Sequence, residues 1–153
     1  MRHIVYRAKR VDGVCFWAEG YIVKTPITAE FNDANGSFFD SGKTRYCIVT
    51  EFGVAHEIEP ETICQFTGLK DKNGNEIYES DLITDKSGRV WEIKWRNAPV
   101  GFGLFIVNEK KKKFDGRIGR FTTSMIDYQM TDMEVIGNIY ENSELLKAKE
   151  GKV

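Results

Sequence analysis

The chain has 153 residues, of which 41% are hydrophobic and 29% are charged, and its formal net charge is −1 at pH 7. This length can bury a core as one domain or as two small ones, and a net charge near zero gives no overall attraction to nucleic acid or anionic membranes. No apolar run approaches the roughly 20 residues of a membrane span, and the N-terminus lacks the apolar core of a signal peptide. We therefore expect a cytoplasmic protein that does not enter a membrane.

The cysteines and histidines are too few and too scattered to predict a metal site. Cys15, Cys47 and Cys64 are widely spaced without a Cys-x-x-Cys pair, and only His3 and His56 could join them. Such spacing is typical of reduced core thiols rather than a disulfide framework or a tetrahedral zinc site. We expect no metal and no cofactor.

The first sixty residues predict an N-terminal β subdomain. Apolar and polar residues alternate in short runs, and Gly20 within the second run predicts a bulge or bend. Pro60 interrupts the pattern and predicts the boundary between subdomains 1–60 and 61–153. The predicted strands cover residues 3–8, 14–24, 45–50 and 53–58.

The densest turn chemistry lies between residues 65 and 83. Asp71-Lys72-Asn73-Gly74 predicts a hairpin turn, because the aspartate can accept backbone hydrogen bonds while Asn and Gly tolerate positive φ. A second corner is expected at 79–81. A calcium loop is not predicted, since Glu76 and Leu82 stand where glycine and the bidentate glutamate belong. We interpret the motif as structural, built on Gly68, Asp71, Asn73, Gly74 and Asp81.

The remainder predicts a second β subdomain. The clearest strand is Arg89 to Arg96, where Trp91, Ile93 and Trp95 alternate with charged residues. Further strands are expected over 81–85, 102–108 and 133–140, with a turn at 86–88 and a short C-terminal helix over 144–149. Because the strand after Asp81 is followed at once by a hairpin, we predict a mostly β fold with an SH3-like small β-barrel.

These segments resemble the phage YopX-like family. The resemblance rests on Pro60-Glu61-Thr62-Ile63, on 65–74, on Glu76-Ile77-Tyr78-Glu79 with Asp81, and on 135–142, with Arg2 and Tyr6-Arg7-Ala8 at the start. This chain departs from the family at Cys64 and Ser80, where the family usually has glycine, and a positive φ at Ser80 would carry strain. The resemblance implies a small, mostly β protein encoded by phages and prophages, without an established activity or site residues.

Charge is distributed unevenly along the chain. Residues 86–120 carry ten basic and three acidic side chains, a net charge of +7, whereas 51–85 carry two basic and nine acidic ones, a net charge of −7. The basic segment is the candidate for nucleic-acid contact, with Trp91, Trp95 or Phe114 available to stack on bases. Its candidate phosphate-contacting residues are Lys110, Lys111, Lys112, Lys113, Arg117 and Arg120.

Assembly or protein binding is the function that we favour over nucleic-acid binding. The oppositely charged halves can meet between copies, and Phe38-Phe39 on a turn-rich loop could anchor a partner. We therefore expect a homo-oligomer, with a protein partner as a further possibility.

No catalytic residue is predicted. The remote enzymatic alternative is a metal-dependent nuclease that would use Asp81 or Asp85 with Glu92 and Lys94. An acid and a lysine two residues apart are also what the polar face of an ordinary surface strand shows, so we predict that the protein is not an enzyme.

Overall fold

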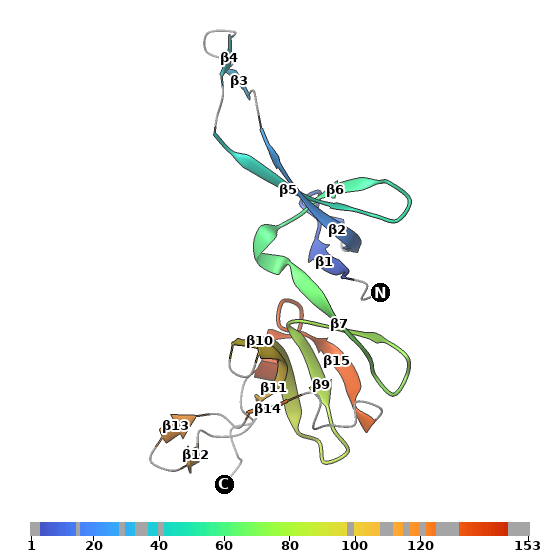
Figure 1. The fold of residues 1–153 in the computed structure, drawn as a ribbon, viewed down its shortest axis with the longest axis vertical. Coiled ribbons are helices and arrows are strands. Elements are labelled where there is room, and N and C mark those ends of the chain that lie inside the picture. Colours follow the sequence, from blue (N-terminus) through green and yellow to red (C-terminus); the bar gives the residue numbers. More distant parts are fainter. Residues whose placement is uncertain are drawn as a thin grey trace. The chain divides into compact units, whose positions relative to one another are not determined.

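In a computed structural model of the chain, the structure describes residues 4–14, 16–27, 30–32, 37–39, 42–97, 100–107, 112–114, 117–119, 122–124 and 132–146. The fold is mostly β, as predicted, and its sheets are antiparallel (Figure 1). It divides into two compact units, an N-terminal unit of Ile4–Gln65 and a C-terminal unit that begins at Phe66. Among the described residues, no helix is long and apolar enough to cross a membrane.

The N-terminal unit is an antiparallel sheet with the strand order β6-β5-β2-β1. Strands β3 and β4 pair separately from this sheet, so Phe38 and Phe39 belong to a strand rather than to the loop that we predicted. The strands of the unit are β1 (Tyr6–Lys9), β2 (Trp17–Pro26), β3 (Glu30–Asn32), β4 (Ser37–Phe39), β5 (Thr44–Val49) and β6 (Ala55–Glu57).

The core of the N-terminal unit is small. Ala8, Ala18, Ile48 and Ile58 are its buried members. A bridge between Arg10 and Ile58 joins the chain after β1 to the chain after β6, so the sheet curls around these side chains. The β2 strand can bend there because Gly20 is a glycine with φ +153°, and a Cβ at this position would lie 2.1 Å from the Val49 carbonyl oxygen.

Strand β7 (Cys64–Lys70) runs from one unit into the other. Its first residues pair with β1, and its later residues pair with β8 (Glu76–Tyr78). It follows a 3-10 turn, η1 (Pro60–Thr62), in which Pro60 begins the turn where its missing N–H is not needed.

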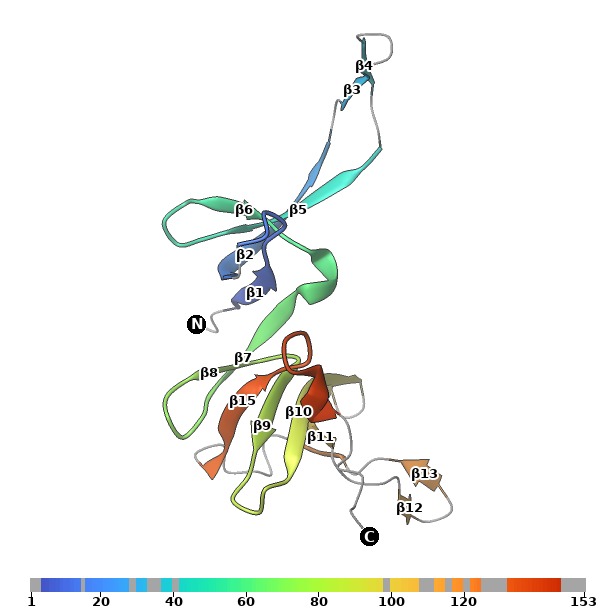
Figure 2. The ribbon, with the colours of Figure 1, turned by 180° about the vertical axis from the view of Figure 1, so that it is seen from behind.

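The C-terminal unit contains a five-stranded antiparallel sheet with the order β14-β11-β10-β9-β15. Figure 2 shows β9, β10 and β11 side by side, with β15 next to β9. The remaining strands, β12 and β13, pair with each other. The bounds are β9 (Asp81–Thr84), β10 (Val90–Asn97), β11 (Val100–Ile106), β12 (Lys112–Phe114), β13 (Arg117–Gly119), β14 (Thr122–Ser124) and β15 (Glu134–Asn138).

One face of this sheet forms the larger core. Trp91 and Ile93 of β10 face Ile106 and Leu104 of β11 across the ladder, and all four are buried. This is the alternation that the sequence of the strand predicts. Trp95 departs from it, because it lies at the end of the strand and remains 43% exposed.

Two predictions about the C-terminal unit need correction or refinement. In place of an α-helix over 144–149, Ser143–Leu146 forms a single 3-10 turn, η4, and residues after 146 lie outside the described part. The five strands form an open sheet in the described part of the chain, without a pair of strands that closes it into a barrel.

Candidate functional site

The predicted turn at Asp71 is an ordered structure built around one carboxylate. Its Oδ1 accepts hydrogen bonds from the amides of Asn73 (2.8 Å) and Asn75 (2.9 Å), and its Oδ2 accepts from the Asn75 side chain (3.1 Å) and the Val135 amide (3.0 Å). Gly74, with φ +86°, closes the turn by donating its amide to the Asp71 carbonyl at 3.0 Å. A carboxylate offers about four lone-pair directions, and here four donors occupy them. The arrangement fits a turn that is fastened to β15, not a cation loop.

The electrostatics of Asp71 follow from these contacts. Burial alone would raise the pKa of this carboxyl, but hydrogen bonds from Val135, Asn75 and Asn73 outweigh burial and lower the pKa below its ordinary value. The neighbouring Lys72 strengthens the attachment, because its amide donates to the Met133 carbonyl at 2.9 Å and its ammonium lies 2.6 Å from Glu134. The turn and β15 therefore form one structural element.

The second predicted corner turns on Ser80 and Asp81. Asp81 is buried, and its Oδ2 accepts a hydrogen bond from the Tyr78 amide at 2.8 Å. Ser80 has φ +66°, which places a non-glycine residue in the left-handed region as its departure from the family pattern suggested. Its amide donates to the Ile93 carbonyl (2.8 Å), and its carbonyl accepts from Ile139 (3.1 Å). The corner therefore links β10 to the chain after β15.

Gly68 also has a structural role, as predicted. Its φ is +86°, and it lies where the register of the β7–β8 pair shifts between Phe66 and Lys70. Only a residue without a Cβ reaches this conformation at little cost, so Gly68 marks a bulge in β7.

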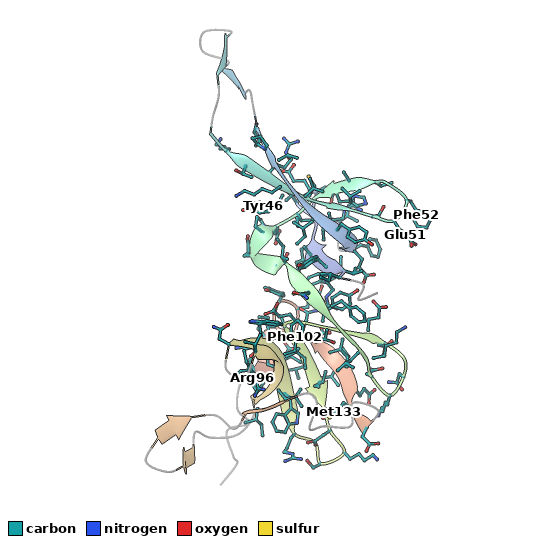
Figure 3. The ribbon with its side chains drawn as sticks, viewed as in Figure 1. Tyr46, Glu51, Phe52, Arg96, Phe102 and Met133 are labelled. Carbon is teal, nitrogen blue, oxygen red and sulfur yellow. The ribbon has the colours of Figure 1, made fainter. Side chains whose placement is uncertain are left out.

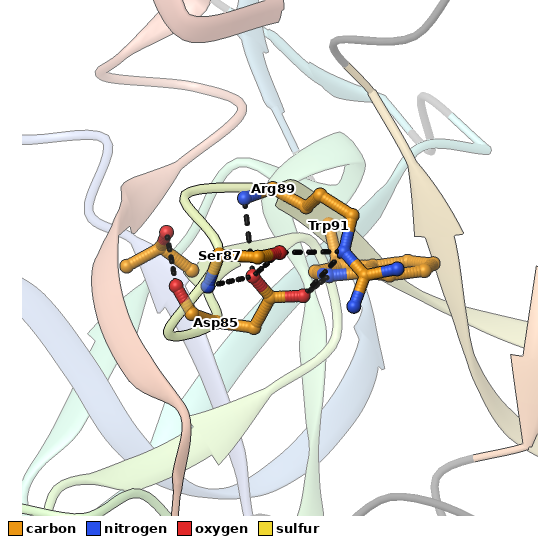
Figure 4. A network of polar contacts seen from close by, with 5 residues as sticks. Asp85, Ser87, Arg89 and Trp91 are labelled. Carbon is orange, nitrogen blue, oxygen red and sulfur yellow. Dashed lines mark hydrogen bonds and ion pairs between the residues drawn. The ribbon is translucent and has the colours of Figure 1, made fainter.

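A third carboxylate, Asp85, organises the turn between β9 and β10 (Figure 4). Its Oδ1 accepts from the Ser87 amide (2.8 Å), the Ser87 hydroxyl (2.5 Å) and the Arg89 amide (3.1 Å). Its Oδ2 accepts from Arg89 Nε (2.7 Å) and Trp91 Nε1 (3.2 Å). Burial tends to raise the pKa of Asp85, but the bonds from Ser87, Trp91 and Arg89 outweigh burial and lower the pKa to about 2.

The residues considered for a nuclease are not gathered into one site. Glu92 and Lys94 share a face of β10 and form an ion pair of 2.9 Å, but Glu92 is buried. Glu92 lies opposite Leu82 in the ladder, so its neighbour Asp81 belongs to the other face of the sheet. Asp85 is engaged by the Trp91 side chain, which also belongs to that other face.

The proposed phosphate-contacting residues lie mostly beyond what the structure describes. Lys110, Lys111 and Arg120 are outside the described residues. Lys112 and Lys113 belong to β12 and Arg117 to β13, which pair as a hairpin whose side chains are not described.

Several other cations of the basic segment are already paired. Lys86 forms an ion pair with Asp132 at 2.7 Å, and Arg89 is held by Asp85. Arg96 differs from them. Among the described residues it has no ion-pair partner, and its Nε atom is buried without a hydrogen bond.

Sequence reasoning missed a further feature, the exposed apolar side chains of the N-terminal unit. Phe52 is 84% exposed and Phe16 is 72% exposed. Phe52 lies in the turn between β5 and β6, in the gap between the predicted strands over 45–50 and 53–58. The exposed large apolar residues of this unit are Ile4, Val11, Val14, Phe16, Tyr21, Val23, Phe52 and Val54.

The described residues also define what kind of protein this is. No group of three or more His, Cys, Asp or Glu side chains among them is placed to hold a metal ion. The best-ordered carboxylates, Asp71 and Asp85, are engaged by hydrogen bonds that build turns. The class is a mostly β protein of two units, in which Asp71 and Asp85 each organise a turn.

The chain belongs to the YopX protein family. The sequence model of that family matches residues 19–147, so the match includes the turn stretch around Asp71. It confirms the resemblance inferred from the sequence, and the family implies a phage context. No curated protein matches the chain.

Proposed function

We propose that this protein is a non-enzymatic module that acts by binding, and first of all by self-association. One observation carries the proposal: the N-terminal unit leaves many large apolar side chains exposed while its buried core consists of two alanines and two isoleucines. Exposed apolar side chains that share one face often mark a contact surface, and Tyr21 and Val23 share a face of β2.

The outward face of β2 illustrates the point. Tyr21 and Val23 point away from the core and lie opposite Val49 and Cys47 of β5. Further along the same face, two side chains of β1 lie over the ring of Trp17. The Arg7 guanidinium is 4.9 Å and the Lys9 ammonium 5.8 Å from the centre of that ring. Tyr21 and Val23 are exposed, which suits burial against another molecule.

The architecture also supports assembly. The sheet of the N-terminal unit has β6 at its edge, a strand of three residues that the chain after β1 joins at the Glu57 end, where the Val11 amide donates to the Glu57 carbonyl at 3.1 Å. Exposed edges favour pairing with other chains unless they are covered, and association is one way of covering them.

We propose that the C-terminal unit has an SH3-like arrangement. Strands β9, β10 and β11 form a meander, β14 pairs with β11 after the β12–β13 hairpin, and β15 returns to lie beside β9, an order that such small barrels also have. We also propose that the protein acts in the cytoplasm of a host bacterium, where the thiols of Cys47 and Cys64 stay reduced.

Light scattering after size exclusion tests the proposal. The purified chain is measured over a hundredfold range of concentration, at low and high salt, with and without DNA. We expect an oligomer of defined size that persists at high salt and ignores DNA, because apolar contacts are not screened. A chain that stays monomeric at every concentration contradicts the proposal.

A second candidate function is nucleic-acid binding, supported by the β12–β13 hairpin. The register places Lys112 and Lys113 on one strand and Arg117 on the strand paired with it, so three basic residues belong to one hairpin. Binding of this kind weakens steeply as salt rises. A mobility shift with DNA at low salt, lost when Lys110–Lys113 become glutamates, would favour this candidate over self-association.

A further inference from the structure

The most exposed aromatic residue of the described chain lies on a rigid turn between β5 and β6. The Thr50 amide donates to the Val54 carbonyl (2.9 Å), the Gly53 amide donates to the Thr50 carbonyl (2.9 Å), and the Val54 amide donates to Thr50 Oγ1 (3.2 Å). Gly53 permits the turn with φ +77°. Figure 3 shows Phe52 and Glu51 at the tip of this hairpin.

The turn has the properties of a binding anchor. An aromatic side chain held by a preformed backbone loses little conformational entropy on binding, and such residues often dominate interface energies. Glu51 stands beside Phe52, is exposed, and makes no ion pair within the described part of the chain. The surface that receives this turn must therefore offer apolar area together with a cation.

The face of the β10–β11 ladder around Arg96 offers the guanidinium as the cation and the aliphatic part of the same side chain as apolar area. Arg96 lies opposite Gly101, and Lys94 lies opposite Gly103, so two glycines leave this face of β11 without side chains. A Cβ built on Gly101 would meet nothing within 4 Å, whereas one on Gly103 would lie 2.6 Å from Arg96 Cδ. The Arg96 side chain thus lies flat over Gly103 beside an open surface at Gly101.

Arg96 is also a cation without an ion-pair partner among the residues that the structure describes. Its Nε is buried without a hydrogen bond, and no acidic side chain of the described residues pairs with it. A guanidinium binds a carboxylate through two parallel hydrogen bonds and can stack against an aromatic ring. Glu51 supplies the carboxylate, and the adjacent Phe52 supplies the aromatic ring.

We propose that the Glu51–Phe52 turn of one copy docks on the Arg96 face of a second copy. The contact rests on the proposed self-association and is head-to-tail, because the two surfaces belong to different units of the chain. A symmetric contact between two turns is disfavoured, since it brings two Glu51 carboxylates together. Glu51 pairs with Arg96, and the Phe52 ring covers the glycine surface.

Complementation between two defective variants tests this geometry. Phe52→Ser removes the anchor and Arg96→Glu removes the cation, and each variant alone should associate at least ~10-fold more weakly than the unmodified chain. Mixed in equal amounts, they should form a species of two copies, because each supplies the surface that the other lacks. The double variant Glu51→Lys/Arg96→Glu should recover association by reversing the charge pair.

Controls separate this inference from the broader proposal. Leu69→Ser changes an exposed apolar residue elsewhere, so this variant should associate normally. Arg96→Gln removes the charge but keeps a side chain of similar size, and it should lose self-association as Arg96→Glu does. If the unmodified chain associates but the mixture of Phe52→Ser and Arg96→Glu does not, the head-to-tail contact is wrong while self-association stands. If the unmodified chain is monomeric, both are wrong.

Discussion

The Val135 amide donates a hydrogen bond to the Asp71 carboxylate, 3.0 Å away and 64 residues earlier in the chain. The same carboxylate closes its own turn through Asn73 and Asn75, so one side chain sets the shape of a loop and attaches it to β15. Bonds of this kind between ionised carboxylates and amides are among the stronger ones in proteins.

We predict that Asp71→Asn destabilises the protein by about 2–3 kcal/mol, because an amide cannot accept all four hydrogen bonds and leaves buried donors unsatisfied. Urea unfolding followed by tryptophan fluorescence measures the loss. Asp12→Asn is the control, since Asp12 holds an exposed turn with Arg10 and Val14 and should change stability much less. Equal losses in the two variants would contradict the role assigned to Asp71.

At Ser80, unlike at Asp71, we predict a substitution that stabilises the protein. Ser80→Gly should stabilise the protein by about 0.5–1 kcal/mol, because glycine adopts φ +66° without strain. Glycine also raises the conformational entropy of the unfolded chain, which opposes folding, but we expect the relief of strain to be the larger effect. Ser80→Ala keeps the strain and should give no gain. Thermal melts of the three proteins measure the effect, and a destabilised glycine variant would show that the corner does not strain Ser80.

Asp85 should make stability depend on pH in the acid range. Its pKa is about 2 in the folded chain and 3.8 in the reference state, so the folded chain binds fewer protons than the unfolded chain between these values. The stability that Asp85 contributes is therefore complete above about pH 4 and is lost as pH falls through about 2.

Unfolding experiments between pH 2 and pH 7 test this dependence. Asp85→Asn should be less stable than the unmodified chain at pH 7, by about 1–2 kcal/mol, and the difference should shrink as pH approaches 2. If the difference in unfolding free energy between the two proteins stays constant from pH 7 to pH 2, the ionised form of Asp85 does not stabilise the fold more than the protonated form does.

Gly20 should tolerate no side chain. In Gly20→Ala the new Cβ meets the Val49 carbonyl oxygen at 2.1 Å, a backbone atom that cannot move without breaking the β2–β5 ladder. We expect a loss of about 3 kcal/mol or more. Gly13→Ala is the matched control, since Gly13 also has a positive φ but open space around it, and it should lose about 1 kcal/mol. Chemical denaturation of both variants provides the comparison.

Much of the local structure could be predicted from the sequence. The alternation in Arg89 to Arg96 predicted β10, and the Asp-Lys-Asn-Gly sequence predicted the turn between β7 and β8. Each depends on contacts within a few residues, since strand alternation and turn chemistry are properties of the local backbone. The sequence by itself therefore determined the β class, most strand positions and the structural character of the Asp71 motif.

Only the tertiary structure decided which of these elements meet. The bond from Val135 to Asp71, the burial of Glu92 and the exposure of Trp95 depend on β15 lying beside β9 and on where β10 ends. The candidate contact surfaces have the same origin. Phe52 and Arg96 are ordinary residues in the sequence. The tertiary structure leaves Phe52 exposed and, within the described residues, leaves Arg96 without an ion-pair partner. The physical reason is that alternation fixes the face of a strand on which a side chain lies, whereas its neighbours come from strands that are distant in the chain.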